Sequence, residues 1–193
     1  MLNTPMTLED IIQKTSLVGE KWAVQHARRL LALIQEIGQD LTYDDQLVSL
    51  AAYLHDWGAF PAYAQKGVEH PLRSRQVVEV EILPSLSLSE PASQVLLETI
   101  ELHDYRDLRP PKSNEALLLR EADMLEFLGV IGMARDFARG PRDVQACYQR
   151  IQERKSTIQG RFTLPRSQEI AQVRLERVEI CSRWLEEEGF GSL

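Results

Sequence analysis

Cysteine is scarce in this chain, and long apolar runs are missing. Its 193 residues include two cysteines, Cys147 and Cys181, which are isolated and form no CxxC motif. Isolated cysteines are typical of a reduced, intracellular protein rather than of a disulfide framework. No apolar run approaches the roughly 18–20 residues that cross a bilayer. Residues 1–14 show neither the basic nor the apolar region of a signal peptide. We therefore expect a cytoplasmic protein with no membrane partner.

Positive charge is also in short supply. Lys and Arg total 22 against 29 Asp and Glu, which leaves a net charge of −7. Binding of a nucleic-acid polymer requires an excess of Lys and Arg on one surface, so we expect no such partner. The deficit does not exclude a local basic pocket for a small phosphate ester.

The chain also lacks an internal repeat, a Gly/Ser-rich linker and a Gly-rich phosphate loop. Its length and its apolar fraction of 44% are enough for one domain with a real core. We expect a single domain over residues 1–193. Its ligand-bearing core would cover about 20–135, and a helical extension would cover about 141–188. The apolar side of the last helix could serve the core or a homodimer.

Helical periodicity dominates what is present. Thr7 and Asp10 form a capping-box pattern, and Thr42 with Asp45 repeats it ahead of a helix that ends at Gly58. Strand alternation is not seen, so the predicted class is all-α. Further helices are expected at about 20–37, 71–83, 89–103, 114–139, 141–158 and 166–188.

The polar residues inside these apolar segments form a short ordered set. The chain has four histidines, and each lies in or at the end of a predicted helix. Neutral imidazoles and carboxylates suit a metal ion, which would satisfy groups that are costly to bury alone. Each one taken singly could instead be a hydrogen-bonded core residue, and Asp123 could pair with Arg29 or Arg120. The set is His26, His55, Asp56, His70, His103 and Asp123.

This order resembles the HD superfamily of metal-dependent phosphohydrolases over about residues 20–135. The segment "HARRL" is similar to its first ligand helix, "LAAYLHDWG" to its signature dipeptide and "READMLEFLG" to its closing aspartate helix. The tail "RFTLPRSQEIAQVRLERVEICSRWLEE" is similar to the last helix of small bacterial members. The resemblance implies a compact HD-domain helical bundle with C-terminal helices packed on it.

The resemblance also implies a ligand set. His26, His55, Asp56 and Asp123 match the ligands of a first metal. His70 and His103 match the extra ligands of members with a binuclear site, which we favour. His70 could instead contact substrate. One or two divalent ions are implied, with Fe, Mn, Zn, Ni or Mg left open.

In such a family the metals activate a water, and the resulting hydroxide attacks a phosphate ester. His55 and Asp56 would be the catalytic residues, and the natural substrate would be a nucleotide or a related small molecule. Phosphate contacts are expected from Lys66, Arg73, Arg75 and Arg106, with Arg109 and Lys112 as further candidates. We assign no general acid, because Asp104 would point about 100° away from His103 on a continuing helix.

Two alternatives stay open. The mixed-valent di-iron oxygenases of the same superfamily have a similar ligand order. A non-catalytic, metal-containing nucleotide-binding module is the other. Hydrolysis is preferred by analogy with proteins of this size.

Overall fold

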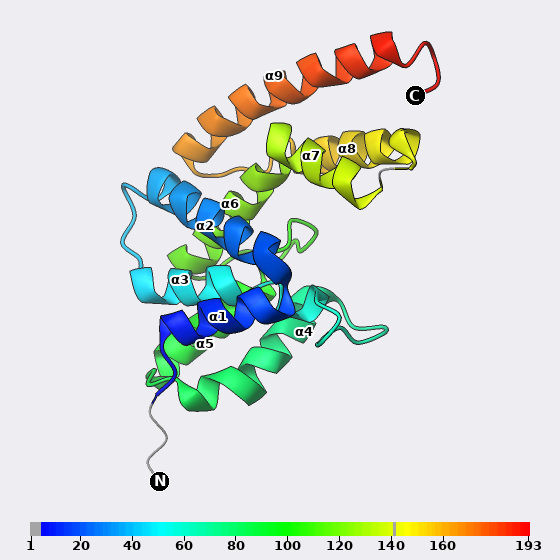
Figure 1. The fold of residues 1–193 in the computed structure, drawn as a ribbon. Helices are drawn as coiled ribbons and strands as arrows, with labels where there is room; N and C mark the ends of the chain where they lie inside the picture. Colours follow the sequence, from blue (N-terminus) through cyan, green and yellow to red (C-terminus); the bar gives the residue numbers. More distant parts are fainter. Residues whose placement is uncertain (1–4, 141) are drawn as a thin grey trace. The chain divides into compact units, whose positions relative to one another are not determined.

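The computed structural model describes residues 5–140 and 142–193, which hold helices and no strand (Figure 1). The all-α prediction is confirmed. The chain forms two compact units, Met1–Arg120 and Glu121–Leu193. No described helix has the length and apolar character that a membrane span requires. The single domain expected over the whole chain stays a prediction.

The first unit is a helical bundle around one apolar core. Leu30, Leu54, Leu96 and Ile100 are fully buried in it. One turn of the α4 region widens to a π-helix over Val78–Ile82 before the segment closes with a 3₁₀ turn. The helices of this unit are α1 (Leu8–Val18), α2 (Glu20–Ile37), α3 (Asp45–Leu54), α4 (His70–Val77), α5 (Glu90–Glu101) and the first half of α6 (Asn114–Phe127).

The helix starts test the capping predictions. The box at Thr7 and Asp10 is confirmed, with each side chain accepting a hydrogen bond from the other's backbone N–H. The box at Thr42 and Asp45 is wrong. Asp44 is the cap of α3, and its Oδ1 accepts from the backbone N–H groups of the second and third helical residues at 2.8 and 3.1 Å. Asp is among the strongest capping residues, so it takes this place from its neighbour.

The turn after α3 is held tightly. This helix ends at Leu54, not at Gly58, and a 3₁₀ turn follows over Trp57–Ala59. The Trp57 indole is fully buried, and its N–H donates to the Thr15 hydroxyl at 3.0 Å. Gly58 lies against the start of α4, where a Cβ would be 2.3 Å from the His70 carbonyl oxygen. The missing side chain is what lets α4 begin beside the end of α3.

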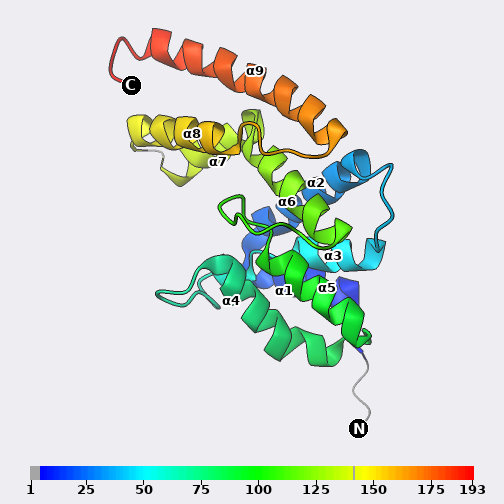
Figure 2. The same cartoon turned by 180° about the vertical axis from the view of Figure 1, so that it is seen from behind.

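The second unit contains the rest of α6 with α7 (Val130–Arg139), α8 (Val144–Ile158) and α9 (Pro165–Glu188) (Figure 2). Met133, Ile151 and Val178 form its small apolar core. The predicted single helix over 114–139 is wrong, because the chain breaks into α6 and α7. Gly129 at the break has φ of +98°, a conformation that favours glycine. The two later helices were expected and are confirmed.

Candidate metal centre

Asp56 lies at the centre of the four histidines. Its Oδ2 is 3.4 Å from His55 Nε2 and 3.9 Å from His26 Nε2. Its Oδ1 is 3.5 Å from His70 Nε2 and 3.8 Å from His103 Nε2. Each carboxylate oxygen therefore faces one pair of imidazole nitrogens.

Several helix ends bring these residues together within the first unit. His26 comes from the middle of α2, and His55 with Asp56 directly follows α3. His70 is the first residue of α4, and His103 follows α5. His26, His55 and His103 are buried, whereas the side chain of His70 is 25% exposed. The cluster therefore has one accessible side, at His70.

Backbone carbonyls orient two of the rings. His55 Nδ1 is 3.0 Å from the Ala52 carbonyl oxygen, and His103 Nδ1 is 2.7 Å from the Ile100 carbonyl oxygen. Each carbonyl lies in the last turn of its helix, where no intrahelical N–H reaches it. A carbonyl can only accept, so we assign the proton of each neutral ring to Nδ1. Each Nε2 then presents a lone pair to the centre of the cluster.

The arrangement of these acceptor atoms calls for a cation. A lone pair on His55 Nε2 faces a carboxylate oxygen of Asp56 at 3.4 Å, and two acceptors at that distance repel. His70 Nε2 and His103 Nε2 approach to 3.2 Å, where a proton or a metal ion must lie between them or beside them. Ligand atoms of His55, Asp56 and His103 all lie within 4.8 Å of one another. This donor set of imidazoles and a carboxylate fits a divalent first-row metal.

The charge state of Asp56 is consistent with a ligand role. Burial raises the pKa of its carboxyl, but positive charge on the rings of His55, His26 and His103, once they are protonated, outweighs that effect and holds the pKa well below its usual value. The carboxyl is therefore ionised, as a metal ligand must be.

Asp123 is the sixth predicted ligand. It belongs to the second unit, where it is a buried residue of α6. Helix α6 runs without a break across the boundary between the units, from Asn114 to Phe127. The role of Asp123 as a ligand stays a prediction from the sequence pattern.

The predicted phosphate contacts differ in how they are engaged. Lys66 is exposed in the loop ahead of α4. Arg73 Nε donates to the Tyr63 carbonyl at 2.7 Å, which fastens that loop to α4. Arg106 is 55% exposed and grips Asp104 with two nitrogens, the shorter contact being 2.6 Å. The role of these residues in binding substrate stays a prediction.

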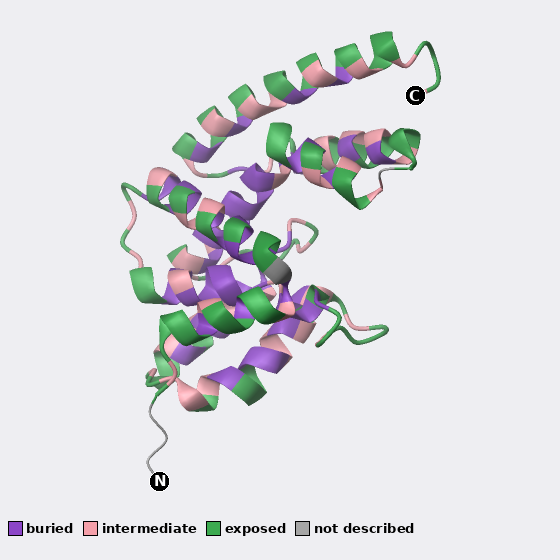
Figure 3. Cartoon of the chain, in the orientation of Figure 1, coloured by how far each residue is buried: buried purple, intermediate pink, exposed green. Residues whose placement is uncertain are grey.

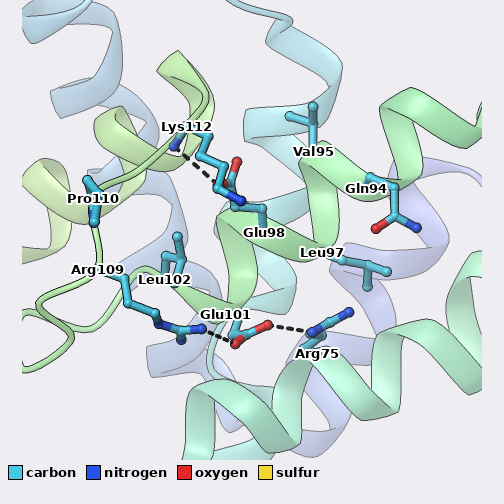
Figure 4. Close-up of a pocket in the computed structure, with 10 residues that line it drawn as sticks. All are labelled: Arg75, Gln94, Val95, Leu97, Glu98, Glu101, Leu102, Arg109, Pro110 and Lys112. Atoms are coloured by element: carbon cyan, nitrogen blue, oxygen red, sulfur yellow. Dashed lines mark hydrogen bonds and ion pairs between the residues drawn. The ribbon is translucent and has the colours of Figure 1, made fainter.

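The other basic candidates, Arg75, Arg109 and Lys112, line a pocket of about 500 Å³ alongside α5 (Figure 4). Glu101 lies between Arg75 and Arg109 there, with contacts of 2.6 and 2.8 Å. The backbone N–H of Lys112 donates to Glu98 at 3.1 Å. Arg75 and Arg109 thus share a carboxylate, and Arg106 holds a separate one.

Asp104 lies close to the site, although the sequence predicted that it would point away from it. The chain leaves the helix after Glu101, so Asp104 does not point away from the site as a helical neighbour would. Its Oδ2 is 3.8 Å from His70 Nε2, and it also lines a pocket of about 370 Å³. The run "DYRDLR" carries the signal that could have shown this. In it both Asp104 and Asp107 accept from the backbone N–H two residues later, which makes a turn.

An all-α fold that gathers histidines and an aspartate from successive helix ends defines a class of metal-site domains. The family comparison identifies which one. The HD domain model matches residues 23–128, and the chain belongs to this family. The predicted family is thereby confirmed. No curated protein matches the chain.

Solved structures agree with the family at the level of the fold. An HD superfamily hydrolase from an uncultured Thermotogales bacterium has a TM-score of 0.64 and 23% identity, covering 94% of this chain and 91% of its own. YpgQ from Bacillus subtilis, solved in complex with ADP, has a TM-score of 0.68 and 21% identity, covering 94% of each chain. An HD-superfamily hydrolase from Bacillus thuringiensis has a TM-score of 0.62 and 20% identity, covering 94% of this chain and 96% of its own. The HD-domain fold of this chain is therefore shown.

Proposed function

We propose that this chain is a metal-dependent phosphohydrolase that holds two divalent ions on either side of Asp56. The observation that carries the proposal is the pairing of each Asp56 oxygen with two imidazole nitrogens. A single metal would need only one such pair. With one pair at each oxygen, Asp56 would be a ligand shared by the two ions.

The ligands divide into two groups in this proposal. His26, His55 and Asp123, with Oδ2 of Asp56, would hold the first ion. His70 and His103, with Oδ1 of Asp56, would hold the second. The partial exposure of His70 supports placing the substrate on that side. A metal bound there lowers the pKa of a coordinated water and so provides a nucleophile near neutral pH.

The chain's own side chains would position the substrate. Arg106 is the best placed for a phosphate group, because it is half exposed and its partner Asp104 lies beside His70. Lys66 is proposed as a second contact from the exposed loop that precedes His70. Arg73 and Arg75 remain predicted contacts, although each would have to leave its present acceptor.

A nucleotide is the proposed substrate class. The structure of Bacillus subtilis YpgQ with ADP shows that a protein with this fold binds a nucleoside diphosphate. Its identity to this chain is 21%, so it supports the class of ligand and not a particular base or bond.

The test is metal content together with a substrate screen. We expect purified protein to bind two transition-metal ions per chain, falling toward one in His70→Ala and in His103→Ala. With metal restored, a panel of nucleoside mono-, di- and triphosphates should release phosphate or pyrophosphate. Asp107→Asn is the matched control, since Asp107 lies in the same loop but forms its pair with Arg109.

Other results would overturn parts of the proposal. One ion that neither substitution disturbs would reject the binuclear site. Two irons with oxygen consumption and no hydrolysis would replace the hydrolase by a di-iron oxygenase. Failure to bind metal under any loading condition would leave a nucleotide-binding module.

A further inference from the structure

The last helix carries an exposed apolar stripe. Val173, Ile180 and Trp184 on α9 are 45%, 37% and 59% exposed. They follow one another at spacings of seven and four, so they lie on one side of the helix with Arg177 between them. Figure 3 shows the buried residues of α9 along one edge of the helix and the exposed residues along the other.

The opposite side of α9 already has its partners within the second unit. Ala171 and Val178 are buried, and Leu185 packs against the small core that Val178 shares with Met133. The exposed stripe is thus not part of that core. A row of aliphatic and aromatic side chains along a long helix is typical of a surface that a partner covers.

The charges beside the stripe indicate what the partner is. Glu176 and Arg183 are exposed and lie seven residues apart, on the same flank of the stripe. Among the described residues of α8, Lys155 pairs with Glu179 and Tyr148 hydrogen-bonds Glu186. Glu176 and Arg183 have no such contact with the described residues of α8 and stay exposed, at the edge of a pocket of about 520 Å³ that α8 and α9 line together.

We propose that α9 pairs in an antiparallel manner with α9 of a second copy of this chain. When Arg177 is placed opposite Ile180 of the second copy, Val173 falls opposite Trp184. Antiparallel helices bring equivalent flanking positions face to face, so Glu176 then meets Arg183 of the second copy, and twofold symmetry makes this pair twice. The surface is complementary to itself in both apolar contacts and charge.

The parallel arrangement is disfavoured by the same residues. It would stack Arg177 on Arg177 of the second copy within the apolar seam, which brings like charges together. The antiparallel arrangement instead lays the aliphatic part of Arg177 against Ile180 and frees its guanidinium to reach solvent. The stripe is short, so the dimer should dissociate on dilution, as weak interfaces do.

Sedimentation velocity of the full-length chain over a range of micromolar concentrations tests the association. We expect a reversible monomer–dimer equilibrium that Ile180→Lys and Trp184→Lys each abolish. Val173→Lys should weaken it, whereas Val144→Lys should not. Val144 is the matched control, because it is also 45% exposed but lies on α8. A monomer at every concentration would overturn the proposal.

Charge reversal tests the orientation. Glu176→Arg and Arg183→Glu each place like charges face to face, and each should raise the dissociation constant on the order of tenfold. The double variant restores opposite charges and should recover the affinity of the unchanged chain. A double variant as weak as the single ones would overturn the antiparallel pairing even if a dimer forms. Circular dichroism of each variant controls for folding.

Discussion

Both units of this protein hold acidic side chains that are buried or partly buried, but they surround them differently. In the second unit, Asp136 pairs with Arg154 at 2.5 Å, and Glu121 accepts from the Thr163 backbone and hydroxyl at 2.7 Å. Every such contact joins an acceptor to a donor. In the first unit, Asp56 faces four imidazole nitrogens, and in two of these rings, His55 and His103, the other nitrogen donates to a backbone carbonyl. Burial alone therefore does not mark a site, whereas acceptors gathered around an acceptor do.

This contrast separates stability from function. The donors around Asp136 and Glu121 stabilise the fold without any ligand, because the desolvated carboxylates are compensated inside the chain. The acceptors around Asp56 need added positive charge, which a proton or a metal ion can supply. A substitution at Asp56 should therefore reduce metal binding, whereas a substitution at Asp136 should reduce the stability of the fold.

The largest effect is expected at Asp56. Asp56→Asn removes the charge that both histidine pairs share, so metal content should fall and hydrolysis should drop by on the order of 10³ or more. The free energy of unfolding without metal should not fall, since the exchange relieves repulsion. Elemental analysis, turnover and thermal unfolding without metal measure the three quantities. Full metal content in the variant would contradict the central role of Asp56.

Asp136→Ala should reduce the stability of the fold and leave the metal content unchanged. Removal of this carboxylate leaves the partly buried Arg154 without its counter-ion and charge-assisted hydrogen bonds, which costs about 1.5–3 kcal/mol of stability. Denaturant unfolding measures that loss, while the metal content of the protein that remains folded should match the unchanged chain. The double substitution Asp136→Leu with Arg154→Met should regain most of the stability, because an apolar pair of similar size needs no compensation. A double variant no more stable than Asp136→Ala would contradict this account.

The sequence predicted which residues gather better than it predicted where the helices begin, break and end. The all-α class, the family and the meeting of His26, His55, His70 and His103 around Asp56 follow from a pattern of residue types at helix ends. Which of several adjacent polar residues caps a helix depends on the local backbone geometry, so the sequence did not predict Asp44 as the cap of α3.

The position of Asp104 was missed for a related reason. It depends on where α5 stops, and helix ends are the least certain part of a periodicity argument. The break at Gly129 depends on a left-handed backbone that a single glycine permits but does not require. Patterns in residue type predict which groups gather, and tertiary packing decides where each helix ends.

Gly58 offers a way to disturb half of the site through packing. In Gly58→Ala the new methyl would lie 2.3 Å from the His70 carbonyl oxygen and 2.5 Å from the Ser74 nitrogen. Overpacking of this kind costs roughly 1–3 kcal/mol and should move the start of α4. We expect the ion proposed at His70 and His103 to be lost first, with metal content falling toward one per chain. Ala59→Ser at the exposed neighbour is the control and should retain both ions.

The smallest effect on stability is expected at Glu101. This carboxylate belongs to the first unit but, unlike Asp56, is paired with two donors, Arg75 and Arg109. Burial raises the pKa of its carboxyl, but Arg109 and Arg75 outweigh this and hold the pKa below the ordinary 4.5. A lowered pKa in the folded state adds stability that is present above pH 4.5 and is lost as the pH falls through the folded-state pKa. Glu101→Gln should therefore cost about 0.5 kcal/mol at neutral pH and progressively less in acid. Urea unfolding at several pH values measures the difference, with exposed Glu79→Gln as the control. A penalty that stays constant into acid would mean that the charge of Glu101 does not contribute, and that Glu101 holds its two arginines by packing alone.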